Sequence, residues 1–275
     1  MTQEPVPEWL IAAWERLYIV SNGSKPDRSV NVRNIQTPTL FGDCRIPKDR
    51  PNYSCPLHEL TDAELGTLYA QEGFSGFTTV EGDVTTWHHE IDYQPPDGSI
   101  DIGRIEIAAG RNMYEHGVQS SYMEHWWNLA SGDGWYFGVK VLRKLPDGTT
   151  RIHEILSVNG DDFIYARNRP KDLPMANSMA DLIRKTNASR DQILEYLDCE
   201  VSHGYVLGGS KHWEIQFSTL PNKTGQALEF VERIVVDPQT GAVSHRKNNP
   251  DEIWAFPVNT LKTEDLVVLF PGKMN

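Results

Sequence analysis

The chain has 275 residues, with 26 Lys and Arg against 38 Asp and Glu, which gives a formal net charge of −12 with neutral histidines. This balance argues against a nucleic-acid binder or a protein that binds anionic membranes, since both need a surplus of Lys and Arg. Gly and Pro make up about one residue in seven, a fraction typical of a globular chain rather than a low-complexity one.

The apolar runs are short and the cysteines are few. The longest runs, 9–14 and 266–270, are far below the ~18 residues that a membrane-spanning helix needs. The N-terminus lacks the basic region and apolar run of a secretory signal. Cys44, Cys55 and Cys199 have no Cys-x-x-Cys spacing and are typical of reduced thiols. We therefore expect a cytoplasmic protein.

The predicted elements are mostly strands. A helix is expected first, over 7–16, because its large apolar residues share one helical face. Capping boxes at Thr61 and Ser189 predict two more helices, to about 71 and 197. Elsewhere, Gly, Asn and Asp turn signals recur about every 8 to 12 residues between β-rich runs, which favours a mainly β fold. The expected strands are 17–20, 30–36, 74–80, 85–93, 100–107, 122–129, 135–142, 151–158, 201–207, 212–219, 228–236 and 253–258.

The two halves of the chain share three features in the same order. These are an Arg-Pro pair, a capped helix and a tryptophan-led strand, at Arg50, Thr61 and Trp87 in one half and at Arg169, Ser189 and Trp213 in the other. The pattern predicts two duplicated, intimately packed units, 1–131 and 132–275, joined near residues 131–134. Each unit is expected to be a small barrel or half-barrel, because antiparallel strands must close or stack to hide their edges.

A family resemblance follows from two short segments and this layout. Trp213-Glu214-Ile215, Tyr122-Met123-Glu124-His125-Trp126-Trp127 and the paired units resemble the Hri-type family of paired calycin-like β-barrels. The resemblance implies an antiparallel lipocalin/calycin-like barrel architecture with few short helices, and it implies no particular activity. The Gly-x-Trp that opens the first strand of lipocalins proper is absent at Trp14, which Ala12 and Ala13 precede.

The strand 85–93 carries the richest set of polar side chains. Period-two alternation places Trp87, His89, Ile91 and Tyr93 on one face. The corresponding face of the strand that begins at Trp213 is apolar, so we expect the face that carries His89 to point into the barrel. His89 is then placed to act as a general acid or base in an apolar cavity. The structural alternative is a core histidine that is bonded to a backbone carbonyl.

Two further strands offer polar candidates. Tyr122, Glu124 and Trp126 share one face, so an interior Glu124 would be a carboxyl with a raised pKa that can shuttle a proton. Its alternative is an exposed strand residue. Asp43 and Arg45 also share a face and can form a fixed pair that grips a carboxylate or polarises a carbonyl. Structural pairing is the alternative for these two.

Two function classes remain open. The first is a cofactor-independent lyase, isomerase or hydratase that acts on a small, partly aromatic or apolar substrate in the barrel cavity. The second is a lipocalin-like carrier or sensor of a small hydrophobic ligand. We expect no metal, since the adjacent His88 and His89 diverge, and heme capture by a histidine is a minor third option. The oligomeric state stays open, a homodimer included. The expected site residues are His89, Glu124 and Tyr122 for catalysis, with Asp43, Arg45, Trp87, Tyr93 and Trp126 for binding.

Overall fold

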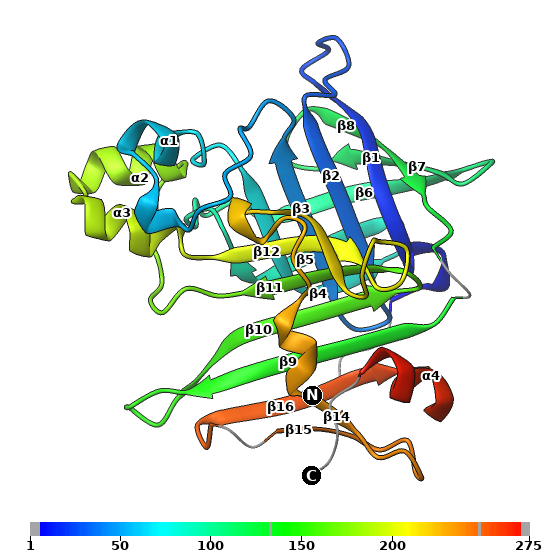
Figure 1. The fold of residues 1–275 in the computed structure, drawn as a ribbon. Coiled ribbons are helices and arrows are strands. Elements are labelled where there is room, and N and C mark those ends of the chain that lie inside the picture. The colour runs from blue at the N-terminus through cyan, green and yellow to red at the C-terminus, as the bar shows by residue number, and fades with distance from the viewer. Residues whose placement is uncertain (1–5, 132–133, 247–248, 271–275) are drawn as a thin grey trace.

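The computed structural model describes residues 6–131, 134–246 and 249–270 (Figure 1). Strands account for 44% of the residues and helices for 16%, which confirms the mainly β prediction. No helix within the described ranges is long and apolar enough to cross a membrane. The residues at the expected join include 132 and 133, which lie outside the described ranges.

The first half of the chain forms a closed barrel of eight antiparallel strands (Figure 1). Each strand pairs with the next one along the chain, and the last pairs with the first, from Trp14 opposite Asn128 to Ser21 opposite Tyr122. Closure satisfies the backbone groups of both edges. The strands are β1 (Ala12–Ser21), β2 (Val30–Gln36), β3 (Phe41–Pro47), β4 (Glu72–Glu81), β5 (Val84–Asp92), β6 (Asp101–Ala108), β7 (Asn112–Gly117) and β8 (Tyr122–Asn128).

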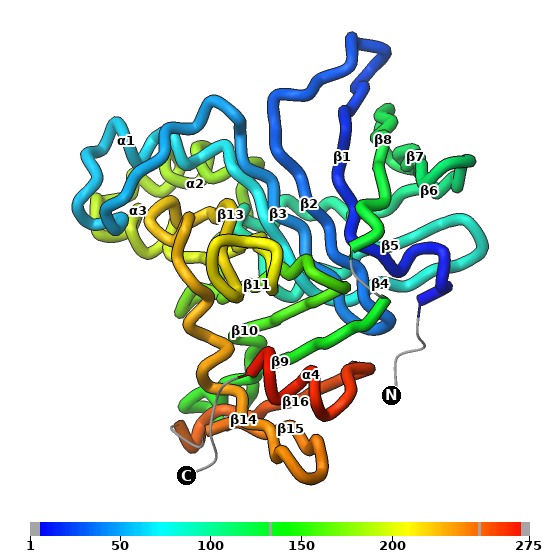
Figure 2. The backbone as a smooth tube through the Cα atoms, turned by 45° about the vertical axis from the view of Figure 1, so that its right-hand side comes forward, coloured from blue at the N-terminus to red at the C-terminus, as the bar shows by residue number. Residues whose placement is uncertain are grey.

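The second half forms an open sheet of six strands in the order β13-β12-β11-β10-β9-β16. The sheet lies against the barrel wall, and the C-terminal elements lie on its other side (Figure 2). A separate two-stranded ribbon is formed by β14 (Ile234–Val236) and β15 (Val243–His245). The sheet strands are β9 (Tyr136–Lys144), β10 (Thr150–Asn159), β11 (Asp162–Arg167), β12 (Glu200–Tyr205), β13 (Glu214–Ser218) and β16 (Glu252–Asn259).

The barrel wall and the sheet bury one apolar core between them. Outward side chains of the wall, such as Ile35 and Cys44, pack with Ile164 of β11 in a cluster with almost no exposed surface. The layers approach so closely at Gly42 that a Cβ atom there would lie 2.5 Å from the Ile164 Cγ2 atom. The segments of β2 and β3 around this contact are therefore buried on both faces, which fixes the wall on which the candidate site is built.

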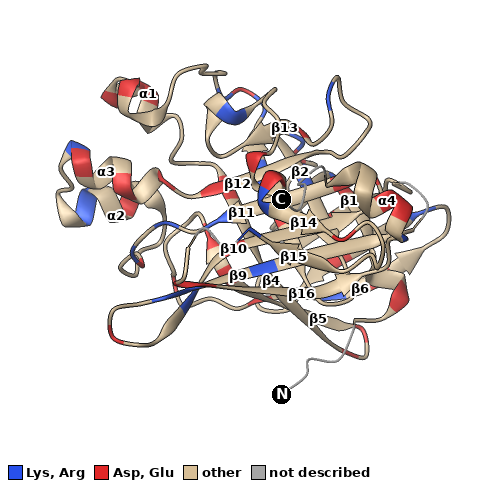
Figure 3. Cartoon of the chain, turned by 60° about the horizontal axis from the view of Figure 1, so that its bottom comes forward, with Lys and Arg blue, Asp and Glu red and all other residues tan. Residues whose placement is uncertain are grey.

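Short helices close one end of the molecule (Figures 1 and 3). They are α1 (Asp62–Gly66), α2 (Met179–Thr186) and α3 (Arg190–Leu197), and acidic and basic side chains are interspersed along α2 and α3. Both expected capping boxes are present, at Thr61 and Ser189. The first helix is shorter than expected and ends at Gly66. A fourth helix, α4 (Thr263–Leu269), packs on the far side of the sheet with the 3-10 turn η4 (Glu229–Arg233).

The expected helix over 7–16 is wrong. Only Glu8–Leu10 form a 3-10 turn, η1, and β1 begins at Ala12. Ala12 pairs with Gln36 of β2 and Trp14 with Asn128 of β8, so this segment closes the barrel. Tertiary pairing on both sides outweighs the helical spacing of the apolar residues.

The repeated landmarks lie in different surroundings. Trp87 lies in β5 and faces the barrel interior. Trp213 precedes β13 with a left-handed φ of 57° and packs between Phe163 and Phe270, in the core on the far side of the sheet. The first half is thus a closed barrel and the second an open sheet.

Candidate functional site

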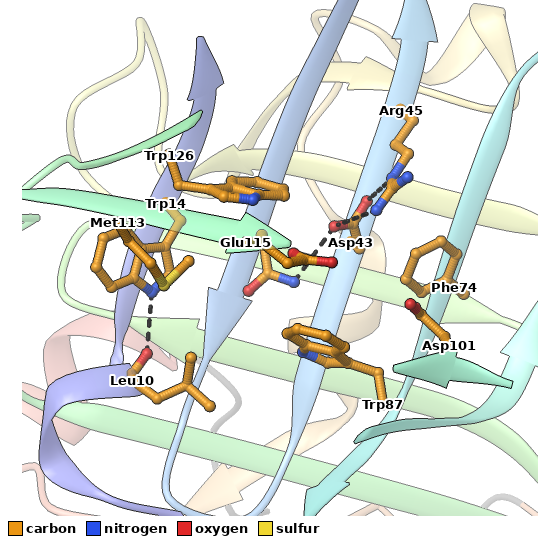
Figure 4. Close-up of a pocket in the computed structure, with 11 residues that line it drawn as sticks. Leu10, Trp14, Asp43, Arg45, Phe74, Trp87, Asp101, Met113, Glu115 and Trp126 are labelled. Atoms are coloured by element: carbon orange, nitrogen blue, oxygen red, sulfur yellow. Dashed lines mark hydrogen bonds and ion pairs between the residues drawn. The ribbon is translucent and has the colours of Figure 1, made fainter. Parts of the chain in front are cut away.

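The barrel interior holds a small cavity of about 20 Å³ (Figure 4). A space of this size accommodates about one water molecule. Side chains from all eight barrel strands and the η1 turn face it, most of them aromatic or charged. Its lining consists of Leu10, Trp14, Asn34, Asp43, Arg45, Phe74, Trp87, Asp101, Met113, Glu115 and Trp126.

A larger groove adjoins this cavity at one mouth of the barrel. Its volume is about 790 Å³, within the range of about 300–1,000 Å³ that small-molecule sites occupy. Phe74, Trp87 and Asp101 line both spaces. The opposite wall of the groove comes from Arg151 and from residues 168–178 of the second half. A ligand in the groove would therefore meet the barrel cavity at these three shared side chains.

His89 stands at this mouth between two carboxylates. Its Nδ1 atom lies 2.7 Å from Asp92 Oδ2, and its Nε2 atom lies 3.0 Å from Asp101 Oδ2. Burial lowers the pKa of the imidazole, but the hydrogen bonds to Asp101 and Asp92 outweigh it and raise the pKa from 6.5 to about 9. At neutral pH the ring is an imidazolium that donates from both nitrogens.

A β-bulge separates His89 from Ile91 and Tyr93, two of the residues that were expected to share its face. Gly76 pairs with His89 and Ser75 with Ile91, so Glu90 is an extra residue. Beyond the bulge, Ile91 packs in the core between barrel and sheet.

Tyr93 lies beyond the same bulge and follows Ile91 into that core. Its hydroxyl donates to the Leu68 carbonyl at 3.1 Å. The expectation that Tyr93 faces the cavity with Trp87 and His89 is not met, because strict alternation does not continue through a bulge.

Glu115 is a buried carboxyl inside the cavity, and sequence reasoning missed it. Only 5% of the residue is exposed, and the Tyr122 hydroxyl donates to Glu115 Oε1 at 2.6 Å. Burial, and then the nearby carboxylates of Glu124 and Asp101, raise its pKa well above 4.5. Gly103 leaves room for this side chain, since a Cβ atom there would lie 2.7 Å from Glu115 Cγ.

Glu124 lies inside the barrel, as expected, but as half of an ion pair. Arg16 donates to its Oε1 atom, and Arg45 Nη1 lies 3.9 Å from the same oxygen. The Oε2 atom is buried without a hydrogen-bond partner in the described part of the chain. A carboxylate paired in this way is poorly placed to carry a proton.

Asp43 and Arg45 form the expected same-face pair. Arg45 Nε lies 2.8 Å from Asp43 Oδ1, and the guanidinium lies over the ring of Phe74, 4.9 Å from its centroid. Asn34 Nδ2 donates to Asp43 Oδ2 at 3.3 Å. Arg45 also lies 3.7 Å from Glu72, so its charge is already engaged with carboxylates of the barrel.

The structure brings together most of the residues expected at the site. Trp87, Trp126, Asp43 and Arg45 line the cavity, and Tyr122 contacts it through Glu115. The lining residues that sequence reasoning missed are Leu10, Trp14, Asn34, Phe74, Asp101, Met113 and Glu115. The available signal for Glu115 was its i, i+2 spacing from the apolar Met113, which places both side chains on one face of a strand.

Other side chains of β5 that carry metal-ligating atoms are bonded to separate partners. His88 contacts Thr79 Oγ1, Glu90 pairs with Lys140, and Asp92 bonds His89.

A different group has metal-ligating side chains close together. Ligand atoms of His153, Glu154 and Glu252 all lie within 4.8 Å of one another. Arg233 bonds both carboxylates there, at 2.9 Å and 2.6 Å, so a cation already offsets part of their charge.

Comparison of the chain with family models, with curated proteins and with solved structures finds no match in any of the three. The candidate site is therefore interpreted from the chemistry of its own residues.

Proposed function

We propose that the protein is a cofactor-independent enzyme that moves protons on a small molecule bound at the barrel mouth. One observation carries the proposal: two carboxyl groups, Glu115 and Asp101, line one cavity in opposite environments. Glu115 is buried beside a hydroxyl donor, whereas Asp101 accepts a hydrogen bond from a cationic histidine. Enzymes separate a proton donor from a proton acceptor in this way.

Glu115 is the general acid in this scheme. Burial and the neighbouring carboxylates raise its pKa well above 4.5, which favours the protonated form that a general acid needs. Tyr122 fixes the carboxyl by donating to Oε1, which leaves the other oxygen for a substrate. Burial also raises the pKa of Tyr122, so its hydroxyl stays a donor.

Asp101 is the general base, and His89 positions it. The sequence had suggested His89 as the acid or base. Both of its nitrogens are within hydrogen-bond distance of carboxylates, so it lacks the free lone pair that a base needs. Its imidazolium instead orients Asp101 toward the cavity.

The substrate lies mainly in the groove. The cavity admits one or two atoms, so only the reacting end of a molecule enters the barrel, past Phe74 and Trp87. The larger part occupies the groove against these aromatic side chains. The lyases, isomerases and hydratases that add, remove or relocate a proton at carbon use the general acid–base chemistry that this arrangement supports.

The proposal is tested by deuterium exchange. Purified protein is incubated in D₂O with a library of small metabolites, and mass spectrometry detects compounds that gain deuterium. We expect wild type to label at least one compound and Asp101→Asn and Glu115→Gln to label it at least about 100-fold more slowly. Equal labelling by wild type and both variants would refute the proposal.

A carrier or sensor is the second candidate, and the volume of the groove favours it. About 790 Å³ lined in part by Tyr69, Phe74 and Trp87 suits a bound small molecule even without chemistry. Native mass spectrometry of freshly purified protein would detect such a ligand. A protein that is consistently empty, yet active in deuterium exchange, would exclude a purely passive role.

We also infer a calycin-like relationship for the barrel and a cytoplasmic setting. The up-and-down order of its eight strands supports the likeness to lipocalins and to the Hri-type family. Unpaired Cys44, Cys55 and Cys199 support a reducing compartment. Descent of both halves from one duplicated unit rests on the three landmarks in the sequence.

A further inference from the structure

The indole of Trp126 presents a buried hydrogen-bond donor to the barrel cavity. Trp126 lines the barrel cavity and is 3% exposed, yet its Nε1 atom has no hydrogen-bond partner among the described residues. Figure 4 shows the ring next to Glu115 on the same side of the cavity. A buried donor without an acceptor costs about 1–3 kcal/mol, so such a group calls for an explanation.

Three other buried or half-buried indoles among the described residues are bonded. Trp14 donates to the Leu10 carbonyl at 2.9 Å, Trp213 to the Leu269 carbonyl at 2.8 Å and Trp254 to a carboxylate at 3.1 Å. Trp14 lines the same cavity as Trp126. An indole that lines this cavity can thus bond a backbone carbonyl of the chain, whereas the fully buried Trp126 Nε1 atom has no such acceptor among the described residues.

A second donor faces the same space. Glu115 is buried, its Oε1 atom is engaged by Tyr122, and no cation lies within ion-pair distance of it among the described residues. A carboxyl group in such surroundings keeps its proton and donates it. Trp126 and Glu115 therefore place two hydrogen-bond donors at the cavity, where a single acceptor atom of a ligand can bond both.

We propose that the acceptor is the carbonyl oxygen of a neutral substrate, held between Trp126 Nε1–H and the Glu115 carboxyl, with Asp101 removing a proton from the adjacent carbon. This inference rests on the proposed function and names its substrate class. The carbonyl oxygen is small enough for the cavity, and two convergent donors stabilise the charge that develops on it.

The proton transfer balances within the site. The C–H bond next to the carbonyl breaks, and its proton goes to Asp101. Its electron pair forms the C=C bond, and the π pair of the carbonyl moves to oxygen, which takes the proton of Glu115. An enol results, and return of the proton from Asp101 to the same carbon, with the enol O–H proton passing back to Glu115, regenerates the carbonyl compound. No oxidant or further reactant is needed.

The cations of the barrel favour a neutral substrate over an anionic one. Arg16 already bonds Glu124, and Arg45 bonds Asp43 and lies near Glu124. His89 is held by Asp92 and Asp101. A phosphate or carboxylate in the cavity would have to take one of these cations from its partner and would face the remaining carboxylates.

The test uses a matched pair of probes, 4-nitrophenol and 4-nitroanisole. The phenol presents an oxygen that resembles an enolate, and the methyl ether cannot. We expect wild type to bind the phenol by calorimetry at least about tenfold more tightly than the ether, and Trp126→Phe to lose about tenfold in phenol affinity. Trp127→Phe, on the opposite face of the same strand, should keep the affinity. In wild type the ¹⁵N-indole signal of Trp126 should shift on phenol addition, which tests the contact without a variant.

The outcomes separate this inference from the proposed function. Equal affinity for both probes, or an unmoved Trp126 indole signal, would overturn the carbonyl assignment. Deuterium exchange confined to compounds without a carbonyl would also overturn it and would leave the proton-transfer function standing. Phenol binding that depends on Trp126, without exchange in any carbonyl compound, would keep the oxygen-binding site and refute the enzyme.

Discussion

The imidazole of His89 lies parallel to the phenyl ring of Phe74, with ring centroids 3.9 Å apart and an angle of 12° between the planes. The ring that carries charge between two carboxylates thus has an apolar support on one face. Phe74 also supports the Arg45 guanidinium, 4.9 Å from its centroid. One aromatic side chain therefore organises two cations at the entrance to the cavity, and both hold carboxylates in place.

His89 should stabilise the fold in a pH-dependent way. Its pKa is raised from 6.5 to about 9, so its contribution is fully present below pH 6.5 and is lost as pH rises through 9. We expect His89→Asn to cost about 2 kcal/mol at pH 6 and much less at pH 10, measured by urea unfolding. His58→Asn, at an exposed site, is the control. A cost for His89→Asn that does not change with pH would contradict the assignment.

Glu115→Gln should raise stability at neutral pH while it abolishes exchange. The pKa of Glu115 is raised in the folded protein, so the wild-type protein loses stability as pH rises above 4.5. A Gln side chain does not ionise, so the variant has no such loss, and its amide oxygen still accepts a hydrogen bond from Tyr122. We expect the variant to be about 1 kcal/mol more stable than wild type at pH 7 and no more stable at pH 4. Glu106→Gln, on the exposed side of β6, should show no such dependence. A variant that unfolds at pH 7 would show that Glu115 is a structural anion.

The sequence predicts which face a side chain lies on in strands whose residues strictly alternate between the two faces. It fails where a bulge interrupts that alternation. Residues 30–36 form a strand with the expected bounds, and Asp43 and Arg45 pair because i and i+2 share a face. Tyr93 was misplaced because the bulge at Glu90 depends on how β4 and β5 pair, which no local pattern in β5 records.

Other failures come from pairing between distant parts of the chain. The segment 7–16 has a helical spacing of apolar residues, yet neighbours far along the chain make it a strand. Asp101 and Glu115 became site residues only when barrel closure brought β6 and β7 around Trp87. Their roles depend on contacts with His89 and Tyr122, which no spacing in one strand reveals.

Gly103→Ala should disturb Glu115 directly. A Cβ atom at this position would lie 2.7 Å from Glu115 Cγ and 2.9 Å from its Oε1 atom, so the carboxyl must move. We expect a loss of about 1–3 kcal/mol in unfolding free energy. In a Glu115→Ala background the same change should cost much less, which a double-mutant cycle measures. Gly66→Ala, where a Cβ atom would have no neighbour within 4 Å, is the control. A cost that persists without Glu115 would place the strain elsewhere.

The pH profile of exchange should separate the base from the residue that positions it. Asp101→Asn removes the proton acceptor, so we expect exchange to fall by a factor of about 100 or more at every pH. His89→Gln keeps the Asp101 carboxylate but loses the cation that orients it, so a smaller loss is expected at neutral pH. Wild-type exchange should also decline above pH 9, where His89 gives up its proton, and this alkaline decline should be absent in His89→Gln. A decline that persists in that variant would belong to another group, and an Asp101→Asn protein with wild-type exchange would show that the proton leaves the substrate by a different route.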